Sequence, residues 1–197
     1  RFQLLSSSRR DVEPRQAAMR NAIDWSWELL PPAEREALAQ CSVFSGGFNL
    51  DAAEAVLDIQ TPGAPWELDL IEALRDKSLL RVYEPTDFPG ELRFGLYESI
   101  REYAADRLKE AGGVDAAEER HAGYYVTMGE ELAARLNVHG GLLRYRRLSL
   151  ETDNLLAVCR RRYYADRDQA MRAVLVLAPV LEDRGPQTTY VELLELA

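Results

Sequence analysis

A β-hairpin is predicted by one stretch of the chain, LRVYEPTDFPGELRF at residues 80–94. Apolar and polar side chains alternate on both arms of this stretch, with Leu80, Arg81, Val82 and Tyr83 before the turn and Leu92, Arg93 and Phe94 after it. Alternation with a period of two is typical of strands, and the turn-rich segment from Pro85 to Gly90 is too long for a tight two-residue turn. An isolated hairpin is barely stable in water, so this ribbon needs helices to pack against.

The first helix predicted ahead of the hairpin begins near Pro14, because proline is suited to the first turn of a helix. Its apolar face is broad, since two stripes lie side by side: Met19, Ile23, Trp27 and Leu30 in one, and Ala18, Ala22, Trp25 and Leu29 in the other. A lone surface helix has a narrower apolar face. We therefore expect this helix to be largely buried, with its tryptophans in the core.

Further helices are predicted around the hairpin. Pro31-Pro32 separates the first helix from the second, and Asn49 is a suitable N-cap for the third. A fourth helix covers residues 67–77, and a fifth runs from Glu98 to the helix-ending pair Gly112-Gly113. Helices packed around a single two-stranded ribbon are the layout of a winged helix.

Beyond Gly113 only helices are predicted. One long amphipathic helix ends at Gly140-Gly141, and it carries apolar residues at spacings of three and four: Ala117, His121, Tyr125, Met128, Leu132 and Leu136. Further helical segments cover residues 142–150, 155–163 and 170–181, with Asp168 as a cap and Pro179 as a kink in the last. The short connections indicate antiparallel helical hairpins, as at the start of a tetratricopeptide-like α-solenoid, although no clean repeat signature is present.

The predicted fold class is therefore mainly α: a winged-helix domain with one β-hairpin, followed by antiparallel helical hairpins. We place the winged-helix domain at residues 14–113 and the helical-repeat region at 114–197, with residues 1–13 as a linker or the tail of a preceding domain. The chain does not begin with Met, and residues 190–196 continue a helical pattern up to its end. We expect it to be part of a longer protein.

The net charge, the cysteine positions and the length of the apolar runs each disfavour a class of function. A net charge of −9 opposes non-specific binding to nucleic-acid phosphates. The two cysteines, Cys41 and Cys159, lie outside any metal-binding spacing and fit a reducing compartment. No apolar run is long enough to span a membrane. These features favour a cytoplasmic protein without a metal site or a membrane segment.

Four segments in a fixed order carry a family resemblance: RNAIDWSWELL at residues 20–30, SVFSGGF at 42–48, DKSLL at 76–80 and ESIREYA at 98–104. Together they resemble the winged-helix region of bacterial signal-transduction ATPases with numerous domains, a class that includes large AfsR-like and LuxR-type transcriptional regulators. The resemblance covers residues 14 to 110 and is looser afterwards, where those proteins continue into tetratricopeptide-like repeats.

The resemblance implies an upstream nucleotide-binding domain that holds ADP or ATP and over which the winged helix closes. This chain has no GxxxxGK[ST] phosphate-binding motif, so we expect no cofactor in it. Many family members carry a Met-His-Asp motif whose His contacts the bound diphosphate, and here Leu96-Tyr97-Glu98 occupies that place. The resemblance makes Tyr97 the candidate nucleotide-sensing residue, with an ordinary half-buried tyrosine as the alternative.

No group of residues predicts catalysis. His121 and His139 have no Cys, Asp or Glu partner at metal-ligand spacing, and we expect His121 to be a packed helix residue. Arginines cluster at residues 144–147 and 160–162, which makes Arg144, Arg147 and Arg161 candidates for binding a partner or an anion. The alternative is a set of surface arginines held in intramolecular ion pairs.

The predicted function is therefore regulatory and non-enzymatic: the segment couples the upstream nucleotide-binding domain to helical repeats that bind a protein or a small effector. The alternative is a winged-helix DNA-binding module of a transcription factor. Direct nucleic-acid binding is disfavoured because the helix before the ribbon is acidic, with Glu67, Asp69, Glu72 and Asp76 against Arg75 and Lys77.

Overall fold

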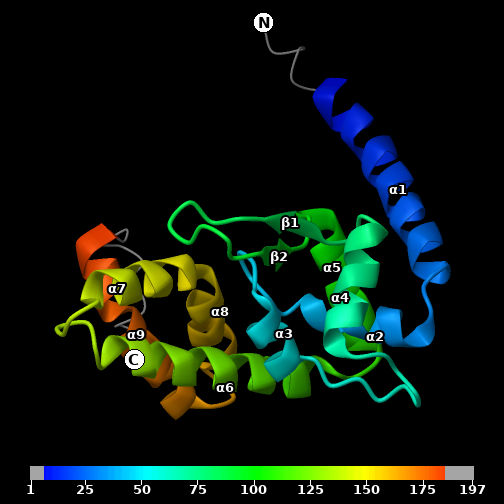
Figure 1. Cartoon of the computed structure of the whole chain (residues 1–197). Coiled ribbons are helices and arrows are strands. Elements are labelled where there is room, and N and C mark those ends of the chain that lie inside the picture. Colours follow the sequence, from blue (N-terminus) through cyan, green and yellow to red (C-terminus); the bar gives the residue numbers. More distant parts are fainter. Residues whose placement is uncertain (1–6, 185–197) are drawn as a thin grey trace, which may run out of the picture.

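The computed structural model describes residues 7–184 of the chain, and side chains from residue 18 to residue 183. The elements before the hairpin are α1 (Ser7–Glu28), α2 (Pro32–Cys41), α3 (Leu50–Val56) and α4 (Glu67–Asp76) (Figure 1). The hairpin consists of β1 (Arg81–Tyr83) and β2 (Arg93–Gly95), and after it come α5 (Glu98–Glu110), α6 (Val114–Ala133), α7 (Gly141–Leu150), α8 (Thr152–Arg162) and α9 (Arg167–Arg184). The predicted mainly α fold with one hairpin is confirmed. Within the described residues, no helix combines the length and apolar character that a bilayer crossing requires.

The hairpin is antiparallel, and Val82 pairs with Phe94 at its centre. Phe48 extends this pairing, because its N–H donates to the Phe94 carbonyl at 2.9 Å and its carbonyl accepts the Phe94 N–H at 2.8 Å. Phe94 is buried, whereas Leu92 is 55% exposed and Arg93 is only 1% exposed. The simple alternation of apolar residues inward and polar residues outward therefore fails in the second arm, since Arg93 has a carboxylate partner inside the molecule.

Local signals located the starts of α2 and α3 correctly, whereas the helix predicted to continue to Gly140-Gly141 ends at Ala133. Pro32 begins α2, and the Asn49 side chain caps α3 by accepting the Ala52 N–H at 3.0 Å. Two predicted starts were wrong. α1 begins at Ser7, ahead of Pro14, because proline disfavours an interior helical position without forbidding it. The cap of α9 is Asp166, whose carboxylate accepts the Gln169 N–H at 3.0 Å, whereas Asp168 already lies in the first turn. The segments expected at residues 1–6 and 190–196 lie outside the described residues.

One apolar core runs through both halves of the described chain. The helix α6 runs beneath both halves and packs against α3 of the first half and against α8 and α9 of the second (Figure 1). An aromatic group joins the halves: Phe44 stacks on Phe48 with ring centroids 4.1 Å apart and meets the edge of His121 at 5.6 Å. His121 is 1% exposed, which confirms the prediction of a packed helix residue. The domain boundary at Gly113 stays a prediction, because the core continues across it.

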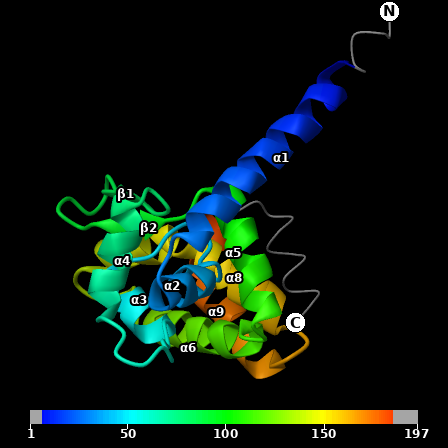
Figure 2. The same cartoon turned by 90° about the vertical axis from the view of Figure 1, so that its right-hand side faces the viewer.

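The helix α1 leaves the body of the protein and projects away from it (Figure 2). Its expected burial is wrong for one of the two apolar stripes: Trp25 is 67% exposed and Leu29 is 62% exposed. The other stripe packs on α5, where Trp27 meets the Tyr103 ring edge-on at 5.8 Å. A broad apolar face requires a partner on each side, and the described residues supply a partner on one side only.

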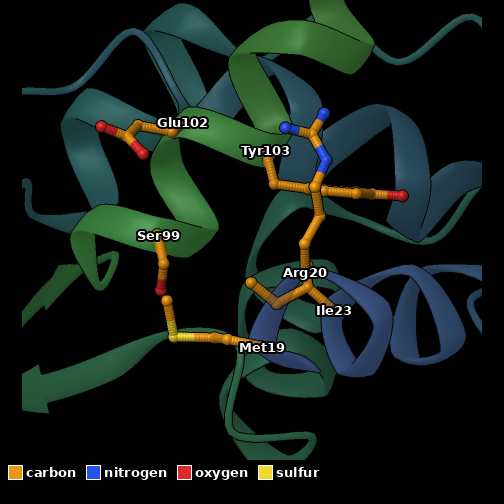
Figure 3. A pocket seen from close by; sticks show the side chains of 6 residues that line it. All are labelled: Met19, Arg20, Ile23, Ser99, Glu102 and Tyr103. Atoms are coloured by element: carbon orange, nitrogen blue, oxygen red, sulfur yellow. The ribbon is translucent and has the colours of Figure 1, made fainter. Parts of the chain in front are cut away.

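A groove lies between the C-terminal half of α1 and α5 (Figure 3). It encloses a cavity of about 250 Å³ lined by Met19, Arg20, Ile23, Ser99, Glu102 and Tyr103. Met19 reaches toward Ser99 across this groove. Two polar contacts hold the helices together: Arg20 pairs with Asp106 at 2.9 Å, and the Tyr103 hydroxyl donates to Asp24 at 2.6 Å. Burial and the hydrogen bond to Asp24 raise the pKa of Tyr103 to about 12.

The two tryptophans of α1 give a matched pair of substitutions. We expect Trp25→Ala to change the free energy of unfolding by less than about 0.5 kcal/mol, because the side chain is mostly in solvent. Trp27→Ala removes a half-buried aromatic contact and should cost about 1–3 kcal/mol. Urea unfolding followed by circular dichroism measures both. Equal losses in the two variants would contradict the described position of α1.

Candidate functional site at the wing junction

The junction between the hairpin and the helical region is built around a buried ion pair. Arg93 on β2 donates to both carboxylate oxygens of Glu151, Nη1 to Oε1 at 2.5 Å and Nη2 to Oε2 at 2.8 Å. The side chains are 1% and 5% exposed. Burial alone lowers the pKa of Arg93, but the hydrogen bond and the charge of Glu151 raise it above its ordinary value. Arg93 is therefore a permanent cation that is neutralised within the protein.

Asn154 extends this pair into a network. Its Nδ2 donates to the Gly47 carbonyl at 2.8 Å, and its Oδ1 accepts the Ser45 N–H at 2.8 Å. These partners determine the orientation of the amide, since a carbonyl cannot donate and an N–H cannot accept. The Oδ1 atom also lies 3.2 Å from Nε2 of His121. The Nε2 of His121 must therefore carry the proton of the neutral ring.

We call residues 45–47 the glycine loop, which touches the hairpin on one side and α8 on the other. Gly46 and Gly47 have positive φ angles of 85° and 135°. A Cβ atom at Gly47 would stand 2.2 Å from the Tyr83 hydroxyl, and one at Gly46 would stand 2.7 Å from the Asp153 carboxylate. The Gly47 carbonyl accepts from both Arg93 and Asn154. Glycine is required here because the backbone approaches both neighbours closely.

We call residues 84–92 the wing loop, and a second set of contacts holds it against α7. Arg147 donates to both oxygens of Glu91 at 2.5 Å, and its guanidinium lies 3.9 Å from the centroid of the Phe88 ring. The hydrogen bond from Arg147 lowers the pKa of Glu91. Arg146 approaches Asp87 at 3.5 Å. The wing loop is thus bound to the helical region along its length.

The residues predicted as a site lie at separate places. Tyr97 is 55% exposed, and its carbonyl accepts the N–H groups of Ile100 and Arg101 at the start of α5. Arg144 donates to the carbonyl of His139, and Arg161 donates to the carbonyl of Val43 at 2.6 Å. Of the three candidate arginines, Arg147 alone contacts the wing loop. Their roles in binding a partner or an anion, and the nucleotide-sensing role of Tyr97, stay predictions.

Sequence reasoning missed the central residues of the junction. The alternating pattern predicts that Arg93 is an outward-facing polar residue of a strand. The position of Glu151 between two predicted helices indicates a surface carboxylate. The one sequence signal for the junction was SVFSGGF at residues 42–48, where two adjacent glycines precede a buried phenylalanine.

Neither cysteine is a ready nucleophile, because burial raises the pKa of the Cys159 thiol to about 12 and that of the Cys41 thiol further. Among the described residues, no group of His, Cys, Asp or Glu side chains has the arrangement to hold a metal ion.

The buried ion pair predicts a non-additive mutant cycle. We expect Arg93→Met and Glu151→Met each to cost about 3–5 kcal/mol of unfolding free energy, because each leaves a buried charge without its partner. The double variant should recover a large part of that loss, since neither charge remains. Denaturant titrations of the four proteins measure the coupling. Additive losses would show that the two charges do not depend on each other.

His121 predicts a pH dependence of stability. Burial lowers its pKa from 6.5 to about 3, so the unfolded chain binds the proton more readily than the folded one. The folded protein should therefore lose about 1.4 kcal/mol of stability for each pH unit below 6.5, until the folded pKa is reached. Thermal unfolding at pH 8, 6 and 5 measures this slope. His121→Gln is the control, and it should flatten the slope between pH 6.5 and 5, where the carboxylates are still ionised.

Comparisons with known proteins find relatives of this chain in mycobacteria. It is 35% identical over 161 residues to "Putative HTH-type transcriptional regulator Rv0890c" of Mycobacterium tuberculosis, and the same values hold for a regulator of that description in Mycobacterium bovis. The match covers 79% of this chain but 17% of the relative. An uncharacterised protein of M. tuberculosis is 30% identical over 122 residues, which cover 61% of this chain and 30% of that protein.

No family model matches the chain. No solved structure matches it at a significant level. The chain spans about a sixth of the length of the regulators that it matches. The homology therefore connects this segment to part of a large protein that is described as a transcriptional regulator of the helix-turn-helix type.

Proposed function

We propose that this chain is a non-catalytic segment of a larger cytoplasmic transcriptional regulator, in which the winged module and the helical region transmit a signal through their mutual contacts. The observation that carries the proposal is the wing junction. The hairpin is joined to α7 and α8 by Arg93 with Glu151 and by Arg147 with Glu91. A displacement of the helical region would therefore be passed directly to the hairpin.

The homology supports the regulatory part of this proposal, because the relatives are described as transcriptional regulators. We further propose that the signal originates in an upstream nucleotide-binding domain that holds ADP or ATP, as the resemblance of residues 14–110 implies. The helical region would then bind a protein or a small effector. This is a docking equilibrium, in which a ligand shifts the population of two arrangements that it binds with different affinity.

The second candidate is direct DNA binding by the winged module, which the helix-turn-helix description of the relatives favours. Two features of the described residues weigh against it. The two cations at the C-terminal end of α4 are both in ion pairs, since Arg75 pairs with Asp76 and the C-cap Lys77 pairs with Glu34. The wing loop carries Glu84, Asp87 and Glu91, and it faces α7. A wing that enters a DNA groove needs basic side chains and an open surface.

A charge-exchange experiment tests the transmission of a signal through the junction. In the regulator that contains this segment, Glu91→Arg and Arg147→Glu should each alter the output of a transcriptional reporter, because each places like charges opposite each other. The double variant Glu91→Arg/Arg147→Glu should restore part of the response, because it re-forms the pair in reverse but places a second cation beside Arg93, whose Nη1 lies 3.6 Å from Glu91. Single variants that accumulate normally and regulate normally would remove the junction from the mechanism.

DNA binding by this segment has its own measurement. We expect no saturable change in the fluorescence anisotropy of a labelled duplex at about 50 mM salt, where non-specific electrostatic binding is strong. Saturable binding that weakens steeply with added salt would instead support the second candidate. Arg81→Gln in the hairpin would then identify whether the wing carries that contact, since Arg81 is exposed and has no ion pair among the described residues.

A further inference from the structure

The helix α9 is apolar on almost every side. Between Ala170 and Leu181 its only polar side chain is that of Arg172. Helices that are apolar all round are normally buried on all sides. The helices α6, α7 and α8 pack against α9 and cover a large part of its surface. The side chains that they bury are Ala173, Val174, Val176, Leu177, Val180 and Leu181.

One stripe of α9 is left without such a cover by the described residues. Leu175 is 66% exposed, and Met171 and Ala178 are partly exposed. Positions 171, 175 and 178 follow one another at spacings of four and three, so they lie on one face of the helix. Asp168 and Glu182 continue that face at its two ends and are exposed. We call Met171, Leu175 and Ala178 the outer stripe.

The residues that follow α9 carry an apolar pattern of their own. Residues 185–197 lie outside the described part of the chain, and they begin with Gly185-Pro186, a pair that ends helices. Thr189 and Glu192 have the spacing of a capping box, in which each side chain bonds a backbone N–H at the start of a helix. The apolar residues then recur at helical spacing: Tyr190, Leu193, Leu194 and Ala197.

We propose that residues 190–197 form a helix that lies antiparallel to α9 and covers the outer stripe with its apolar face. Helices joined by a short connection normally pack as antiparallel neighbours, and residues 185–189 supply a connection of the usual length. A helix over residues 190–197 is about 12 Å long at 1.5 Å per residue. On the same scale Glu182 and Leu175 are about 10 Å apart along α9, so the segment reaches the centre of the stripe.

The charges at both ends agree with this direction. An antiparallel helix would begin beside Glu182, where the positive end of its dipole meets a carboxylate. The carboxylates of Glu192 and Glu195 lie on the face opposite Leu194, so they stay in water when that leucine is buried.

A second copy of the chain fits the outer stripe less well. Two antiparallel copies of α9 would place Asp168 of one opposite Glu182 of the other. Like charges in that position repel each other, and the chain already carries a net charge of −9. The segment of the same chain is therefore the occupant that the pattern of apolar and charged residues favours.

This packing does not depend on the regulatory role proposed above, because it concerns the contact of the chain with itself. It does bear on where a partner of the helical region binds. With the outer stripe covered by residues 190–197, such a partner must use another face than that of α9. A failure of the packing would leave the transcriptional proposal untouched.

Nuclear Overhauser effects between methyl groups in the chain of residues 1–197 test the contact directly. We expect cross-peaks that join the methyl groups of Leu175 and Ala178 to those of Leu193, Leu194 or Ala197. Spectra with no such cross-peak would overturn the proposal. The same holds if residues 190–197 show cross-peaks only to the exposed Leu142 of α7.

Hydrogen exchange adds a test with a matched control. Leu175→Ser and Leu194→Ser should each speed the exchange of the α9 amides at residues 171–178 by about tenfold, because each removes a buried leucine from the contact. Leu142→Ser should leave that exchange unchanged, since Leu142 is 65% exposed, as Leu175 is at 66%, but lies on α7. Equal exchange in all three variants would contradict the contact. Cross-peaks that form only between labelled and unlabelled copies would assign the stripe to a dimer and overturn the proposal as well.

Discussion

The buried ion pair between Arg93 and Glu151 is the constraint on which the described arrangement depends. Removing two charges from water is costly, and that cost is offset by the opposite charge and by hydrogen bonds inside the protein. Arg93 reaches Glu151 and the Gly47 carbonyl, and Asn154 supplies a further donor to Glu151 at 3.3 Å. Three segments that are distant in the chain must therefore meet at one point, which explains why the glycine loop approaches so closely.

The same constraint determines the direction of the hairpin. Because Arg93 points into the junction, the wing loop follows α7 and its carboxylates meet Arg146 and Arg147. The ribbon is thus a contact between two parts of one chain. A wing that reads DNA requires a free basic surface, whereas the wing loop here is occupied by α7. The helix-turn-helix description of the mycobacterial relatives refers to proteins of which this chain matches a small part.

The helix α1 is covered by other described residues on one side only. Its apolar residues form two neighbouring stripes, and α5 covers one of them through Trp27 and Tyr103. The stripe that contains Trp25 and Leu29 is exposed. Exposed apolar area of this kind occurs at surfaces that meet other protein.

The amino-acid sequence by itself determined the kind and order of the elements. Apolar spacings of three and four placed the helices, period-two alternation placed the hairpin, and Pro32 and Asn49 marked helix starts, because these signals act through neighbouring residues. Only the tertiary structure decided that Arg93 is buried, that Trp25 is exposed, and that Arg147 binds the wing loop. Arg93 and Glu151 are 58 positions apart, and the burial of a charge depends on whether an opposite charge arrives from elsewhere in the chain. No local pattern carries that information, since a strand with an outward arginine and a strand with a buried, paired arginine have the same alternation.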